Sequence, residues 1–156
     1  MKIAYGNSRM EKKWKNNDIS WDDFCRRVST TQATTETVEE YRKMTKPQQD
    51  SIKDVGGFVG GHLRGGRRKA GTVLCRSMLT LDMDHGTPDV MDELDMFNSH
   101  EMCIYSTHKH TPEAPRLRLV MPLKMCPRMS TRRLRGRWRR RSGWICSMIP
   151  PTSRTG

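Results

Sequence analysis

Leu79-Thr80-Leu81-Asp82-Met83-Asp84 reads as the end of a strand that carries two carboxylates. Residues i and i+2 of a strand point to the same side, so Asp82 and Asp84 can share a pair of Mg²⁺ or Mn²⁺ ions. Such ions activate an attacking hydroxyl group and stabilise a leaving pyrophosphate. The pair alone is a weak signal, because a solvated strand end carries the same acid-x-acid pattern.

The segments around this pair predict an α+β domain. Capping boxes start one expected helix at Ser20, with Asp23, and another at Thr37, with Glu40. Helices that come before a strand–helix–strand–strand series are typical of the α+β class. We expect further helices at 47–53 and 88–97, and strands at 2–5, 72–74, 78–81, 102–106 and 116–121.

A second polar motif, Ser106-Thr107-His108, ends the next expected strand. On a continuing strand Ser106, His108 and His110 would share a face, and a hydroxyl and histidine beside two metals suit contact with nucleotide phosphates. Two alternatives stay open. His108 can be an ordinary surface histidine, or Cys103, His108 and His110 can form a zinc site.

A basic, glycine-rich segment spans 56–69. Its glycines exclude a helix interior and let backbone amides approach phosphates closely. The spacing matches neither an ATPase phosphate loop nor a dinucleotide-binding turn, and a solvated hairpin is an equal alternative. The candidate nucleic-acid-binding residues of this segment are Arg64, Arg67, Arg68 and Lys69.

Arg116 and Arg118 stand two residues apart on the last expected strand. Guanidinium groups bind phosphates through paired hydrogen bonds, so these two side chains are candidates for clamping a triphosphate or template phosphates. The alternative is that they lie on the solvent side of an edge strand.

The positive charge is concentrated at one end of the chain. Residues 1–124 have a net charge of +3, whereas 125–156 contain nine arginines and no acidic residue. Such a tail can bind nucleic acid or an anionic membrane. The five cysteines include no C-x-x-C pair, and the chain shows neither a secretory signal nor a membrane span. We therefore expect a cytoplasmic protein with reduced thiols.

The order of these motifs resembles the archaeo-eukaryotic primase superfamily. The resemblance is strongest to primase-like domains of phages and integrated elements, which often precede helicases of the virulence-associated-protein-E type. It covers about residues 1–124. The matching stretches are Lys12-Lys13-Trp14, 35–41, 53–61, Leu79-Thr80-Leu81-Asp82-Met83-Asp84, Tyr105-Ser106-Thr107-His108 and 115–123.

The resemblance implies template-directed nucleotidyl transfer in a bacterial host cell, with nucleotides and a DNA or RNA template as partners. It implies N-terminal helices beside a mixed sheet of the RNA-recognition-motif type. Asp82 and Asp84 would bind Mg²⁺ or Mn²⁺, while Ser106 and His108 would hold the incoming nucleotide, His108 with a catalytic role. It also implies a third acid after His108, yet Glu113 is the last acidic residue.

The composition changes after Lys124, which divides the chain into a partial catalytic domain, 1–124, and an Arg-rich tail, 125–156. We expect a poorly ordered tail that a frameshift produced. In the shifted frame, Trp144-Ile145 and Met148-Ile149 must each encode an aspartate, where the third acid of the family is expected. A selected Arg-rich binding tail is the alternative, and the nucleotide sequence across codon 124 separates the two.

Three functions remain open at this point. The first is a truncated DNA primase or polymerase domain with weak or no activity. The second is a non-catalytic, basic nucleic-acid-binding protein. The third is a repurposed fragment that inhibits a nucleic-acid system of the host.

Overall fold

The structure is a computed structural model that describes residues 1–95 and 100–127. Beyond Pro127 the expected tail lies outside the described residues, as do the last positions of the expected helix 88–97. None of the helices in the described ranges is long and apolar enough to cross a membrane. The elements are β1 (Lys2–Gly6), β2 (Lys15–Asp18), α1 (Trp21–Ser29), α2 (Val38–Lys43), α3 (Lys46–Ile52), β3 (Gly57–Val59), the 3₁₀ turn η1 (Arg64–Gly66), β4 (Cys75–Met83), α4 (Val90–Asp95), β5 (Cys103–Ser106) and β6 (Leu117–Pro127).

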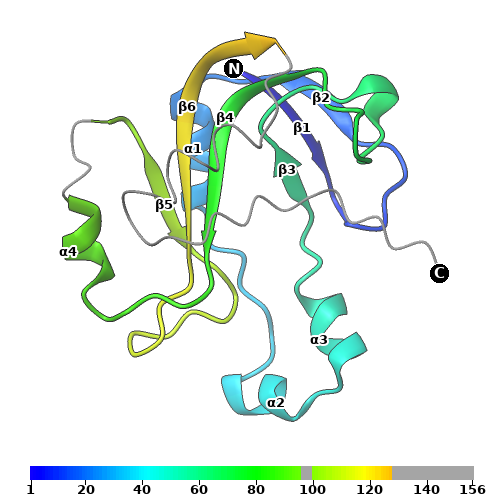
Figure 1. Cartoon of the computed structure of the whole chain (residues 1–156). Helices are drawn as coiled ribbons and strands as arrows, with labels where there is room; N and C mark the ends of the chain where they lie inside the picture. Colours follow the sequence, from blue (N-terminus) through cyan, green and yellow to red (C-terminus); the bar gives the residue numbers. More distant parts are fainter. Residues whose placement is uncertain (96–99, 128–156) are drawn as a thin grey trace.

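The expected α+β class is confirmed. The described strands form two three-stranded sheets, in the orders β2-β1-β3 and β4-β6-β5 (Figure 1). All strand pairs within them are antiparallel: β1 runs opposite to β2 and β3, and β6 runs opposite to β4 and β5. The expectation of one mixed sheet is therefore wrong for the described residues.

Both faces of the β4-β6-β5 sheet are covered, which explains the runs of consecutive buried residues in its strands, such as Leu119, Val120 and Met121 in β6. On one face Leu81 and Leu119 pack with Val90 and Leu94 of α4. On the other face Met78 and Val120 pack with Ile3 of β1 and Phe24 of α1. Each fully buried side chain of this size contributes roughly 1.5–3 kcal/mol, so these two clusters hold the helices to the sheet.

The helix starts follow the expected capping residues. The Ser20 hydroxyl accepts a hydrogen bond from the Asp23 amide at 3.0 Å, at the start of α1. At α2, the side chain of Thr37 and the carboxylate of Glu40 form a complete capping box. Both caps satisfy amides that a helix start leaves free, and both predicted helix starts are confirmed. The capping box predicted at Ser20 is confirmed only in part, because the Asp23 carboxylate accepts from the Ser20 hydroxyl and not from the Ser20 amide.

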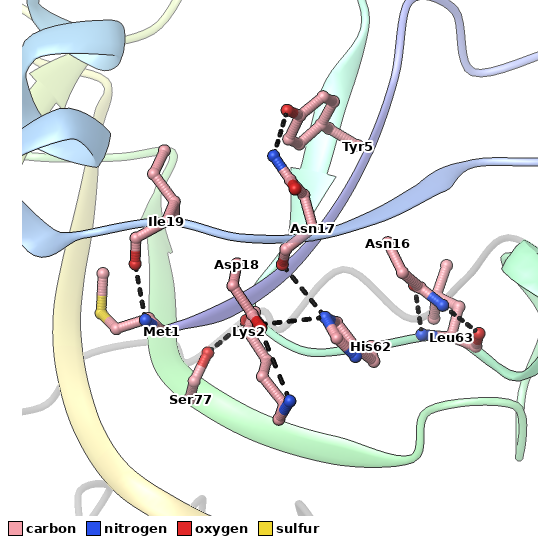
Figure 2. A network of polar contacts seen from close by, with 10 residues as sticks. All are labelled: Met1, Lys2, Tyr5, Asn16, Asn17, Asp18, Ile19, His62, Leu63 and Ser77. Atoms are coloured by element: carbon pink, nitrogen blue, oxygen red, sulfur yellow. Dashed lines mark hydrogen bonds and ion pairs between the residues drawn. The ribbon is translucent and has the colours of Figure 1, made fainter.

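β2 was not expected from the sequence, because Lys15–Asp18 contains no apolar residue and all four of its residues are exposed. Polar contacts hold it in place (Figure 2). Asn16 donates to the Leu63 carbonyl and accepts from the Leu63 amide, both at 2.8 Å. The Asn17 side chain donates to the Tyr5 hydroxyl at 2.9 Å. Amide side chains thus take over the role that apolar alternation has in most strands.

Two glycines join the sheets. The Ser77 amide of β4 donates to the Gly60 carbonyl at 3.0 Å. A Cβ atom on Gly60 would lie 2.7 Å from Cβ of Met78, and one on Gly61 would lie 1.9 Å from the Cys75 carbonyl oxygen. Only glycine permits this approach. At this point the glycine-rich segment serves packing against β4.

Candidate functional site

The two acids and the two arginines lie opposite each other at one end of the β4-β6-β5 sheet. The register pairs Asp82 with Arg118, and Asp84 and Arg116 directly flank the two strands. Arg118 donates from Nε to Oδ1 of Asp82. Nη1 of Arg116 lies 3.4 Å from Oδ1 of Asp84. The antiparallel register therefore unites two motifs that the sequence gives separately.

The two ion pairs differ in burial. The Asp82 side chain is 11% exposed and that of Arg118 is 25% exposed, whereas Asp84 and Arg116 are 61% and 31% exposed. Water screens the outer pair, so it contributes little to stability, while the inner pair is a charge-assisted hydrogen bond in a partly dry setting. Asp82 is thus held in one position, and Asp84 is accessible to solvent.

Tyr105 extends the inner pair across the third strand. The register aligns Asp82, Arg118 and Tyr105 in one row over β4, β6 and β5. Burial raises the pKa of the Tyr105 hydroxyl, although the guanidinium of Arg118 opposes this shift. Burial also acts to lower the pKa of Arg118, but Tyr105 and Asp82 together outweigh it and leave that pKa raised. The row keeps Arg118 charged beside the carboxylate.

The two carboxylates fit a Mg²⁺ or Mn²⁺ ion. Mg²⁺ is commonly bound by one or two carboxylates, with water and substrate phosphates as its other ligands. Each acid is paired with an arginine here, so a metal ion would compete with Arg118 and Arg116. In the two described ranges no group of three His, Cys, Asp or Glu side chains could hold a metal ion, so a third protein ligand is not found there.

Ser106 lies at the same end of the sheet as Asp82 but on its other face. Its partner in the register is Leu117, which belongs to the core under α4. After Ser106 the chain leaves the strand, and the His110 amide donates to the Thr107 carbonyl at 2.8 Å. The expectation that Ser106, His108 and His110 share a strand face is therefore wrong, because the strand ends at Ser106.

The two histidines have separate surroundings. The His108 ring packs against Tyr41 of α2, with ring centroids 4.5 Å apart. Nδ1 of His110 accepts a hydrogen bond from the Arg116 amide at 3.2 Å. The structure thus ties His110 to the arginine side of the site and His108 to the N-terminal helices.

The alternative zinc site is not formed. Cys103 lies beside Cys25 of α1, and their thiols share a hydrogen bond. Burial, together with the neighbouring Cys25, raises the pKa of Cys103 to about 11. A thiol that resists deprotonation is a poor zinc ligand. Among the described side chains Cys25, Cys75 and Cys103 are free of disulfides.

The four basic residues of the glycine-rich segment fall into two groups. Arg64, Arg67 and Lys69 are exposed around η1. Arg68 is half-buried, with its guanidinium 4.6 Å from the centroid of the Trp14 ring. Arg68 and Lys69 also line a pocket of about 90 Å³ between this segment and β4.

Arg76 lines the same pocket and was missed from the sequence. It stands in β4 as a single charge between Cys75 and Ser77, six residues before Asp82. A lone cation inside a strand with two buried faces was the available signal. Its importance depends on the register and on the path of the glycine-rich segment, and neither is evident from the spacing of the motifs.

The fold and the site define an α+β domain in which an acidic strand end faces a pair of arginines. The family model of the VapE N-terminal domain matches residues 1–129. The chain therefore belongs to the VapE N-terminal domain family, which fits a protein of a phage or mobile element. No curated protein and no solved structure matches the chain.

Proposed function

We propose that this domain binds a nucleoside triphosphate with Mg²⁺ or Mn²⁺, as the nucleotide-binding part of a primase-type nucleotidyltransferase. The observation that carries the proposal is the register that sets Asp82 and Asp84 against Arg118 and Arg116. Asp82 and Asp84 would hold the metal ion, and the guanidinium groups of Arg116 and Arg118 suit the phosphates of the nucleotide. The template would be DNA or RNA in the cytoplasm of a bacterial host, and a helicase a partner of the full-length protein.

The ion pairs suggest how the residues would act when a nucleotide binds. Arg116 and Arg118 would turn from the carboxylates to the phosphates, and their charge would offset that of the triphosphate. Asp82 and Asp84 would then be free to hold the metal, which supplies Lewis-acid stabilisation to the transferred phosphoryl group. Tyr105 would remain beside Arg118 and limit how far its side chain moves.

We expect little or no nucleotide incorporation by this chain. The resemblance to primases calls for a third acid after His108, and no acidic residue follows Glu113. Loss of one ligand weakens the hold on two metals. Primer extension with Mn²⁺ measures this directly. Efficient extension that Asp82→Ala abolishes would show that two carboxylates suffice.

Metal binding tests the proposal without requiring turnover. Electron paramagnetic resonance reports free Mn²⁺, and each variant is measured at the same concentration of deoxynucleoside triphosphate. The Asp82→Asn/Asp84→Asn double variant should bind Mn²⁺ at least about tenfold more weakly, because both charged ligands are lost. Asp92→Asn, an exposed change on α4, is the matched control. Equal Mn²⁺ affinity in the double variant and the control would exclude these acids as ligands.

A second candidate function is nucleic-acid binding without catalysis. It is favoured by the exposed cations Arg64, Arg67 and Lys69, which surround η1. Phosphate contacts of this kind release counterions, so affinity for an oligonucleotide should fall steeply as salt increases. Changing all three residues to Gln should reduce the slope of log affinity against log salt concentration by about two to three. An unchanged slope in fluorescence anisotropy would rule out this surface.

A further inference from the structure

A pocket of about 90 Å³ lies between the glycine-rich segment and β4. Four cations from three parts of the chain converge on it, namely Arg68 and Lys69 from the segment, Arg76 from β4 and Arg118 from β6. Thr80 adds a hydroxyl, and Met78 and Phe58 supply apolar wall. The space accommodates several water molecules, which a ligand with phosphate oxygens could replace.

Arg76 is the most informative of these cations. Its side chain is half-buried in β4, and burial lowers its pKa. Among the described residues no carboxylate pairs with it. Taking a charge out of water without a partner is costly, so buried charges are normally paired. An anion in the pocket would provide the missing partner.

The other cations add to this effect. Burial lowers the pKa of Arg68 as well, and Asp54 offsets the shift only in part. Arg118 faces the pocket while its Nε holds Asp82, so it lies between the pocket and the candidate metal ligand. Positive charges gathered around one concavity focus the field and attract anions. A ligand with several linked negative charges would be attracted by all four cations at once.

We propose that this pocket binds the phosphate tail of a nucleotide, with Arg76 and Lys69 as its main contacts and Arg118 as the link to Asp82. The site goes beyond the arginine pair at the strand end, and it rests on the proposed function. The concave shape favours a condensed phosphate over an extended nucleic-acid backbone, which would follow an open basic groove. An anion here competes with Asp82 for Arg118.

Calorimetric titration with inorganic triphosphate in metal-free buffer tests the pocket. Arg76→Gln should weaken binding at least about tenfold, as expected for loss of a charge-assisted hydrogen bond. Lys69→Gln, a change at an exposed side chain, should weaken it a few-fold and guards against a folding defect in the Arg76 variant. Asp82→Asn should tighten binding, because Arg118 then lacks its competing carboxylate. Lys43→Gln is the control, since Lys43 is an exposed cation at the end of α2 and does not line the pocket.

Two further ligands separate the possible failures. The affinities of the variants for a deoxynucleoside triphosphate should rank in the same order as their affinities for inorganic triphosphate, and that result supports the pocket. If the nucleotide binds but Arg76→Gln and Lys69→Gln behave like the control Lys43→Gln, the pocket is excluded while the proposed function stands. If triphosphate binds at the pocket and the nucleotide does not, the proposed function fails. If Arg76→Gln weakens binding of a single-stranded oligonucleotide but leaves binding of triphosphate and nucleotide unchanged, the assignment of the pocket to a nucleotide tail is overturned.

Discussion

Arg118 holds Asp82 across β4 and β6, and the same side chain forms part of the wall of the basic pocket. One guanidinium therefore has two competing anionic positions within reach, one of the protein and one of a ligand. Tyr105 packs on its other side, with the guanidinium carbon 6.0 Å from the ring centroid. This arrangement couples the carboxylate to the contents of the pocket.

Removing the guanidinium should destabilise the domain, because it leaves a largely buried carboxylate unpaired. We expect Arg118→Gln to lower the free energy of unfolding by about 2 kcal/mol, as typical of hydrogen bonds to charged groups. Urea unfolding at neutral pH measures this. In a double-mutant cycle with Asp82→Asn, the double variant should lose less stability than the sum of the two single losses, by roughly 1–2 kcal/mol.

The outer pair is the matched control for this cycle. Arg116 and Asp84 have the same residue types, but the Asp84 side chain is 61% exposed, against 11% for Asp82. Their coupling should therefore stay below about 1 kcal/mol. If the coupling of the outer pair equals that of Asp82 and Arg118, burial does not determine the strength of the inner contact.

Acid should weaken the attachment of the loop after β1. The carboxylate of Asp54 accepts from the Ser8 hydroxyl at 2.5 Å and from the Arg9 amide at 2.6 Å. Burial acts to raise the pKa of Asp54. The two hydrogen bonds and the charge of Arg9 act in the opposite direction and outweigh burial, so the folded pKa lies below its ordinary value. The contact thus contributes fully above the unfolded pKa of about 3.9 and is lost as pH falls through the lower folded pKa.

Urea unfolding between pH 7 and pH 3 tests this linkage. The stability difference between the wild type and Asp54→Asn should be constant above about pH 5 and shrink below about pH 4. Ser8→Ala removes one donor and should reduce the pH-dependent part. A difference that grows as the solution is acidified would mean that the folded pKa is raised instead.

Local patterns predicted the helices and the strand end with its acids, but the pairing of strands depends on distant segments. Ser20 and Thr37 mark helix starts within four residues, so capping is readable locally. The meeting of Asp82 with Arg118 depends on a register set 36 residues apart. β2 was not predicted because Asn16 and Asn17 hold it through polar contacts, so its sequence shows no apolar alternation.

The glycines illustrate the same limit, and they give a further prediction. A methyl group on Gly61 would collide with the Cys75 carbonyl, whereas Gly65 has φ of +60° and open space around it. Gly65→Ala should cost only about 1 kcal/mol, the strain of a left-handed residue. Gly61→Ala should cost more than about 2 kcal/mol, because the segment must move away from β4. Urea unfolding compares them, and equal losses would contradict the close approach.

Tyr41 links α2 to the loop that carries His108. Its ring and its hydroxyl group should have opposite effects on the free energy of unfolding. The buried hydroxyl lacks a hydrogen-bond partner among the described residues. Tyr41→Phe keeps the ring against His108 and removes an unsatisfied polar group, so it should raise the free energy of unfolding by about 1 kcal/mol. Tyr41→Ala should lower it by about 3 kcal/mol.

The His108 ring provides the second readout, because its proton resonances are shifted by the neighbouring aromatic ring in the wild type and in Tyr41→Phe but not in Tyr41→Ala. If His108 holds the incoming nucleotide, Tyr41→Ala should also weaken nucleotide binding while Tyr41→Phe leaves it unchanged. Loss of stability in Tyr41→Phe would mean that the hydroxyl has a partner, and the position of α2 against His108 would then depend on that bond rather than on the contact of the two rings.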